Sequence, residues 1–132
     1  MIDSILVVCV GNICRSPMAE GLLRQSLPDR RIASAGIDAL AGQPADPIAI
    51  ELMRARDLDI TAHRARQLQP RMIIDAGMVL VMELAHRRHL ESQYPPARGK
   101  IFRLCEEASA ASEARQRRNR RGNPDSLNKM HF

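Results

Sequence analysis

The sequence predicts an α/β fold, in which one domain forms a doubly wound, four-stranded parallel sheet. The length of 132 residues suits a single domain. Four largely apolar runs, several of them rich in β-branched residues, are typical of strands buried in parallel sheets. Helical patterns separate these runs, so strands and helices alternate along the chain. The predicted strands are residues 5–8, 31–35, 78–82 and 100–104.

The predicted helices follow from their start signals. Ser16 is a predicted N-cap, with Pro17 at the first helical position. Asp46 and Glu83 are predicted to cap later helices. The helices are expected at residues 17–27, 47–56, 70–76 and 85–93. The buried side of the second helix is expected to consist of Ile48, Ile50, Leu52 and Met53.

The loop between the first strand and the first helix has the sequence Cys-Val-Gly-Asn-Ile-Cys-Arg-Ser-Pro, residues 9–17. Gly11 and Asn12 are the residue types that best tolerate positive φ. In a strand–loop–helix unit, backbone N–H groups and the helix dipole together favour a dianionic oxyanion. The predicted phosphate-binding residues are Val10, Gly11, Asn12, Ile13, Cys14, Arg15 and Ser16.

Three side chains of this loop predict covalent chemistry rather than binding alone. Cys9 ends the strand, where the helix N-terminus and Arg15 favour the nucleophilic thiolate. The planar guanidinium of Arg15 can hold two phosphoryl oxygens at once. Ser16 places a hydroxyl near the sulfur, where it can stabilise a thiolate. A cysteine that ends an apolar strand is otherwise a small buried side chain, and the Arg-Ser pair argues against that interpretation here.

Residues 9–17 resemble the signature of the low-molecular-weight protein tyrosine phosphatases, and residues 1–104 are similar to the bacterial branch of that family. The resemblance implies a flavodoxin-like strand order 2-1-3-4 and a phosphoryl loop after the first strand. It also implies that Ser34 hydrogen-bonds Asn12 and supports the loop, as does Ser16. Leu40 falls where the family places a wall of the substrate groove.

The resemblance further implies a reaction and its partners. Cys9 attacks the phosphorus of a phosphotyrosine protein and forms a phosphocysteine, which water then hydrolyses. The substrate implied by the bacterial members is a tyrosine kinase that controls exopolysaccharide export. Cys14 would act as a resolving thiol that forms a reversible disulfide with oxidised Cys9, and a buried cysteine without a chemical role is the alternative.

The C-terminal part of the chain departs from the resemblance. The phosphatase domain is expected at residues 1–105, and residues 106–132 are predicted to be a divergent basic tail, solvated or disordered. Family members carry an Asp-Pro motif there, whose Asp protonates the leaving oxygen. The nearest feature is Pro124-Asp125, so Asp125 is the candidate general acid. An altered reading frame and a natural divergence are both compatible with this tail.

Two other functions remain open at this point. A chain without its general acid would be a phosphate- or phosphotyrosine-binding protein with negligible turnover. An arsenate reductase of the same fold needs two further cysteines close together downstream, and only Cys105 follows the loop.

The composition favours a cytoplasmic enzyme. Three cysteines form neither a disulfide scaffold nor a zinc motif, and no cluster of ligands implies a metal or another cofactor. No signal peptide or membrane span is expected, and a reducing compartment suits a reactive thiol. Of the net charge of +5, +2 lies after residue 105. The remaining +3 is expected to be spread over the body without interleaved aromatic residues, which argues against nucleic-acid binding.

The other basic residues are predicted to have no catalytic part. His63 lacks a second metal ligand at suitable spacing and is expected to be a structural or surface histidine. Arg64 and Arg66 are expected to be surface charges, with contact to the substrate as the alternative. Helix 85–93 carries a cluster that is expected to form a solvated face, namely His86, Arg87, Arg88 and His89.

Overall fold

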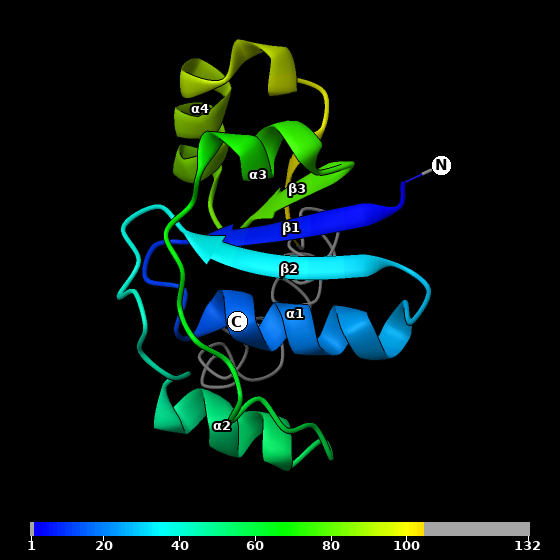
Figure 1. Ribbon diagram of the computed structural model, residues 1–132, viewed down its shortest axis with the longest axis vertical. Coiled ribbons are helices and arrows are strands. Elements are labelled where there is room, and N and C mark those ends of the chain that lie inside the picture. The colour runs from blue at the N-terminus through cyan, green and yellow to red at the C-terminus, as the bar shows by residue number, and fades with distance from the viewer. Residues whose placement is uncertain (1, 105–132) are drawn as a thin grey trace, which may run out of the picture.

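A computed structural model describes residues 2–104 of the chain (Figure 1). Its elements, in order, are β1 (Ser4–Cys9), α1 (Arg15–Ser26), β2 (Arg31–Gly36), α2 (Pro47–Arg54), α3 (Pro70–Asp75), β3 (Met78–Val81), α4 (Leu84–Gln93), the 3₁₀ helix η1 (Pro95–Ala97) and β4 (Ile101–Arg103). The predictions for Cys105, Asp125 and the tail 106–132 fall outside the described residues.

The four strands form one parallel sheet in the order β2-β1-β3-β4, as predicted. This is a flavodoxin-like arrangement. β1 occupies the centre, and Val7 and Val8 are fully buried because both faces of the sheet are covered at this strand. The strand order reverses beside β1, which is where open α/β sheets place their ligands. The first loop therefore starts at this switch point.

Helices cover the two faces of the sheet separately. In Figure 1, α1 and α2 lie on one side of the strands, and α3 and α4 lie on the other. Ala19 of α1 packs with Ile5, Val7 and Ile32 of the sheet. On the opposite face the core consists of Leu6, Val8, Ala35, Leu68, Ile73, Ala76, Val79, Val81, Leu90, Ala97 and Ile101.

The start of α1 differs from the prediction. The helix begins at Arg15, so Ser16 is its second residue rather than its N-cap, and Cys14 at the cap position makes no side-chain hydrogen bond to the helix. The prediction of a Ser16 cap was therefore wrong. The physical reason is that the Ser16 hydroxyl, completely buried, bonds to groups of the preceding loop instead.

The cap of α2 is confirmed, but the prediction of its buried side was partly wrong. Asp46 Oδ1 accepts a hydrogen bond of 2.8 Å from the Ile48 backbone N–H. Ala49 and Met53, four residues apart, face the core, whereas Ile48 and Leu52 are 68% and 53% exposed. α2 packs against α1 rather than the sheet, so the contact covers a narrow stripe of the helix.

The positive charge is not spread evenly over the described body, contrary to prediction. Residues 1–82 contain nine Lys/Arg and nine Asp/Glu, whereas residues 83–104 contain five Lys/Arg and two Glu. The net +3 of the body thus lies on α4, on the turn between η1 and β4, and on β4. No helix among residues 2–104 is both long enough and apolar enough to cross a membrane.

Candidate active site

Cys9 lies at the carboxyl end of β1, with only 5% of its surface exposed. Its Sγ atom is 2.8 Å from Ser16 Oγ and accepts a hydrogen bond of 3.3 Å from the Asn12 backbone N–H. Donors that face a sulfur atom stabilise negative charge on it. The sequence predicted that the Ser16 hydroxyl lies near the Cys9 sulfur, and the structure shows this contact. The arrangement is suited to an attacking thiolate and to a leaving thiolate.

Asn12 fixes the shape of the loop. Its φ of +59° lies in the left-handed region, which Asn tolerates better than most residues. The side chain is fully buried. Its Nδ2 donates to Ser16 Oγ at 2.8 Å and to Ser34 Oγ at 2.9 Å. The hydrogen bond to Ser34 is the one that the resemblance implied. A satisfied buried network of this kind holds one conformation, because any rearrangement leaves polar groups unpaired.

Residues 63–66, which follow α2, hydrogen-bond to the loop at Asn12. The backbone N–H of Arg66 donates to Asn12 Oδ1 at 2.9 Å, and His63 Nε2 is 2.7 Å from the Asn12 carbonyl oxygen. The expected structural histidine is therefore found. Arg66, predicted to be a surface charge, also donates from Nε to the Ser34 carbonyl oxygen at 2.8 Å. Sequence reasoning missed this support, which depends on a contact between residues far apart in the chain.

Arg15 stands at the rim of the loop and forms an ion pair with Glu83. Arg15 Nη2 lies 3.0 Å from Glu83 Oε1. The hydrogen bond from Arg15, followed by its charge, holds the pKa of Glu83 below its usual range. Glu83 occupies the N-cap position of α4, as predicted, but its side chain makes no capping hydrogen bond. The position of Glu83 at the carboxyl end of the strand next to β1 is the signal that could have revealed this contact.

Cys14 lies in the same loop, and its environment differs from that of Cys9. It is partly buried beside the core between α1 and α2. Burial, then the negative charge of Asp46, then Cys9, raise the pKa of the Cys14 thiol. Cys14 is thus kept in the neutral thiol form at neutral pH. Both cysteines are free in this structure.

Leu40 lies beside the loop, on the side of β2. Its backbone N–H donates to the Gly11 carbonyl oxygen at 3.0 Å. A Cβ atom placed on Gly11 would lie 4.0 Å from Leu40 Cδ1, and Leu40 is 53% exposed. Gly36, at the end of β2, allows this close approach, because a Cβ atom there would lie 2.5 Å from the Val10 carbonyl oxygen. Sequence reasoning did not single out Gly36.

The loop therefore combines a nearly buried free thiol, hydrogen-bond donors at its sulfur and a guanidinium at its rim. Within residues 2–104, no three His, Cys, Asp or Glu side chains are grouped so as to hold a metal ion. A thiol with hydrogen-bond donors at its sulfur and a guanidinium nearby is the combination that covalent transfer of a phosphoryl group to sulfur requires.

Known proteins of similar sequence and fold include protein tyrosine phosphatases. A probable low-molecular-weight protein-tyrosine-phosphatase, EpsP of Ralstonia nicotianae, is 53% identical over 106 residues, which are 80% of this chain and 73% of EpsP. Wzb of Escherichia coli K30, solved in complex with sulphate, gives a TM-score of 0.77 at 40% identity, with 80% of this chain and 74% of Wzb covered. Wzb of Vibrio vulnificus, solved in complex with benzylphosphonate, gives a TM-score of 0.77 at 41% identity, and the match covers 80% of this chain and 75% of that Wzb.

The sequence profile of the family described as low molecular weight phosphotyrosine protein phosphatase matches residues 4–117. This range includes the whole described fold from β1 to β4. The chain therefore belongs to the low-molecular-weight phosphotyrosine protein phosphatase family.

Proposed function

We propose that this chain hydrolyses phosphotyrosine in proteins through a phosphocysteine on Cys9. The contact of Cys9 Sγ with Ser16 Oγ and with the Asn12 N–H carries the proposal, because it prepares a thiolate at the base of an oxyanion loop. A related Wzb was solved with benzylphosphonate, which pairs an aromatic ring with a phosphonate as phosphotyrosine pairs a ring with a phosphate. The exposed Leu40 at the loop offers that ring an apolar wall.

The proposed reaction has two steps. The sulfur of Cys9 bonds to phosphorus as the bond from phosphorus to the tyrosyl oxygen breaks, while Arg15 and the N–H groups of residues 10–16 hold the other phosphoryl oxygens. A general acid protonates the leaving oxygen, and we assign this role to Asp125. Water then attacks the phosphocysteine, inorganic phosphate leaves and the Cys9 thiolate is restored. Ser16 donates to the sulfur in its thiolate form.

One observation supports a second candidate, a protein that binds phosphotyrosine with little turnover. Within residues 2–104, the carboxylate in contact with Arg15 is Glu83, and its lowered pKa favours the ionised form, which has no proton to donate. Release of a tyrosyl oxygen therefore depends on an acid elsewhere in the chain. Phosphate or vanadate binding without turnover would favour this candidate.

The proposed partner is a tyrosine-phosphorylated kinase of bacterial exopolysaccharide export. Support for it comes from the bacterial relatives named above, whose names place them among protein tyrosine phosphatases. The reactive thiol of Cys9 favours a reducing compartment, and we propose the cytoplasm.

The test compares the wild type with Cys9→Ser on p-nitrophenyl phosphate and on a phosphotyrosine peptide at mildly acidic pH. We expect turnover by the wild type and a loss of roughly 10³-fold or more in the variant. Equal rates for the two proteins would contradict the proposal.

A further inference from the structure

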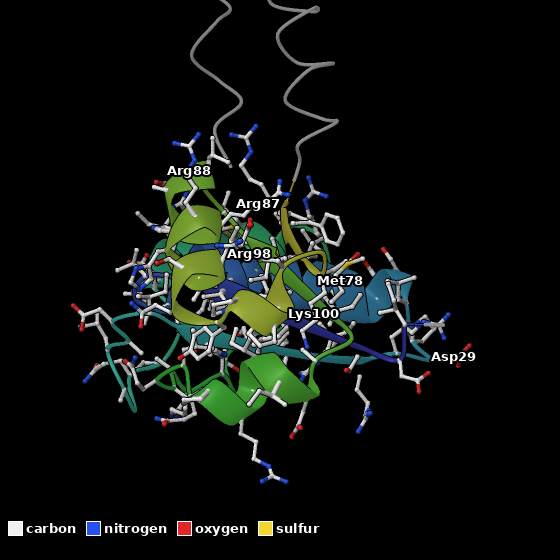
Figure 2. The ribbon with its side chains drawn as sticks, turned by 90° about the horizontal axis from the view of Figure 1, so that it is seen from above. Asp29, Met78, Arg87, Arg88, Arg98 and Lys100 are labelled. Carbon is white, nitrogen blue, oxygen red and sulfur yellow. The ribbon has the colours of Figure 1, made fainter. Side chains whose placement is uncertain are left out.

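The described chain carries its excess positive charge on one part of the surface. Residues 83–104 contain all of the net +3, since residues 1–82 are neutral in total. α4 packs on η1 and β4. Figure 2 shows Arg87, Arg88, Arg98 and Lys100 on the face of the molecule that carries α4. These four residues define the basic face.

Two members of the basic face are used within the fold. Arg87 Nε donates to Glu91 Oε1 at 2.8 Å, one turn further along α4. Lys100 Nζ donates to the carbonyl oxygens of Ile74 and Ala76 at 3.0 and 2.8 Å, close to the end of α3. Their charges contribute to the local potential, but their donors are already engaged.

Arg88 and Arg98 differ from these two residues. Both are exposed, and neither side chain forms a hydrogen bond or an ion pair with any of residues 2–104. Two guanidinium groups without a carboxylate partner leave their donors to solvent or to a ligand. Guanidinium groups favour carboxylate and phosphate oxygens, which they bind in a bidentate manner.

α4, which carries part of the basic face, begins beside the phosphoryl loop. Glu83, in contact with Arg15, immediately precedes the first residue of α4. With a rise of ~1.5 Å per residue, the ten-residue helix is about 15 Å long. An extended peptide covers that length with about five residues, at ~3.3 Å each. A peptide whose phosphotyrosine occupies the loop can therefore lie along α4 with its neighbouring residues.

We propose that Arg88 and Arg98 bind acidic residues two to five positions from the phosphotyrosine of the substrate protein. This inference rests on the proposed function of the Cys9 loop. An acidic peptide is favoured over nucleic acid, because Phe102, 39% exposed, is the one exposed aromatic side chain among residues 83–104, whereas nucleic-acid strands stack on several rings, and Tyr94 is partly buried. The expected solvated face of α4 is thus a substrate-docking surface.

The test uses two phosphotyrosine peptides of equal length that differ only in flanking residues, Asp and Glu in one and Asn and Gln in the other. The wild type is expected to show a several-fold higher kcat/KM for the acidic peptide, and added salt should reduce this preference. The double variant Arg88→Glu with Arg98→Glu should lose about tenfold on the acidic peptide. Its kcat/KM for p-nitrophenyl phosphate should remain within about twofold.

A matched control is Arg56→Glu. Arg56 is also exposed and follows α2, which lies at the opposite end of the molecule from α4 in Figure 1. This variant should keep the wild-type preference. The neutral double variant Arg88→Gln with Arg98→Gln should lose about threefold in kcat/KM on the acidic peptide, which is half of the tenfold loss on a logarithmic scale. Its turnover of p-nitrophenyl phosphate should be unchanged, and this shows that the variant folds.

The outcomes separate the two proposals. If the wild type hydrolyses p-nitrophenyl phosphate and both peptides equally well, or if the preference survives in the double variants, the docking surface is wrong and the proposed function stands. If no substrate is hydrolysed, binding of the two peptides is measured by calorimetry with the same variants. Equal affinities of wild type and double variant for the acidic peptide would then overturn the docking surface. Tighter binding of a nucleic-acid oligomer than of the acidic peptide would also overturn it.

Discussion

Arg15 Nη2 lies 3.0 Å from Glu83 Oε1, although 68 residues separate the two in the chain. The parallel sheet brings them together, because β3 lies beside β1 and both strands end at the same edge. Arg15 is partly exposed at the first position of α1. The ion pair therefore orients a long, flexible side chain before any phosphoryl group arrives. Since a guanidinium has five N–H donors, the others remain for oxygens of the substrate.

Replacement of Glu83 should disturb this orientation. Glu83→Ala is expected to lower kcat/KM for p-nitrophenyl phosphate by about threefold to tenfold, since an exposed ion pair is worth little. Glu83→Gln keeps the acceptor oxygen and should stay within about twofold of the wild type. Initial rates over a range of substrate concentrations give both values. A loss in Glu83→Gln as large as in Glu83→Ala would show that charge, rather than position, is what matters.

The same pair has a pH dependence of known sign. The pKa of Glu83 is lowered in the folded chain by Arg15. The stabilisation is therefore fully present above the ordinary glutamate pKa of about 4.3 and is lost as the pH falls through the lowered value. We expect the Glu83 pKa, followed by NMR, to rise toward its ordinary value in Arg15→Ala. An unchanged titration in that variant would mean that Arg15 is not the cause.

Asn12 is expected to be the residue on which the loop depends most. Asn12→Ala removes the partner of Ser34 Oγ and of the Arg66 N–H and places Ala at φ +59°. Unpaired buried groups cost about 1–3 kcal/mol, so the Tm should fall by roughly 5–15 °C. Calorimetry or circular dichroism measures the shift. Ser34→Ala, which removes one contact, is the control and should have a smaller effect. The reverse ranking would contradict the role of Asn12.

The fold was predictable because its signals are local. The apolar runs and the helices between them require no knowledge of distant contacts. The strand order and the hydrogen bond between Ser34 and Asn12 came from the family resemblance. Glu83, Gly36 and Arg66 were missed, since each acts through a contact made only when separate strands and loops come together. Ser16 was misassigned as a cap because a cap and a sulfur partner both require a hydroxyl at nearly the same place.

Cys14 should not take part in phosphoryl transfer but should protect Cys9. Burial and Asp46 raise the pKa of the Cys14 thiol, so alkylation near neutral pH should modify Cys9 first. Cys14→Ser is expected to retain turnover within about threefold. Its inactivation by peroxide should no longer be reversed by a dithiol, whereas that of the wild type should be. Equal recovery of the two proteins, measured as regained activity, would rule out the resolving role.

The assignment of Asp125 as general acid predicts a dependence on the leaving group. Asp125→Ala should lower kcat about 10²–10⁴-fold for phosphotyrosine and far less for p-nitrophenyl phosphate, whose leaving group needs little protonation. A series of aryl phosphates of graded leaving-group pKa measures the slope for wild type and variant. Parallel slopes would remove Asp125 from the mechanism and leave the weak-turnover candidate in place.

The most direct test of the account is to trap the covalent intermediate. Wild type, Cys9→Ala and Arg15→Ala are mixed with ³²P-labelled aryl phosphate and quenched within milliseconds, and the peptide that contains residue 9 is isolated. The account predicts label on Cys9 in the wild type, none in Cys9→Ala, and far less in Arg15→Ala. Turnover by the wild type without any label on Cys9 would show that water attacks phosphorus directly, and the proposed mechanism would be wrong.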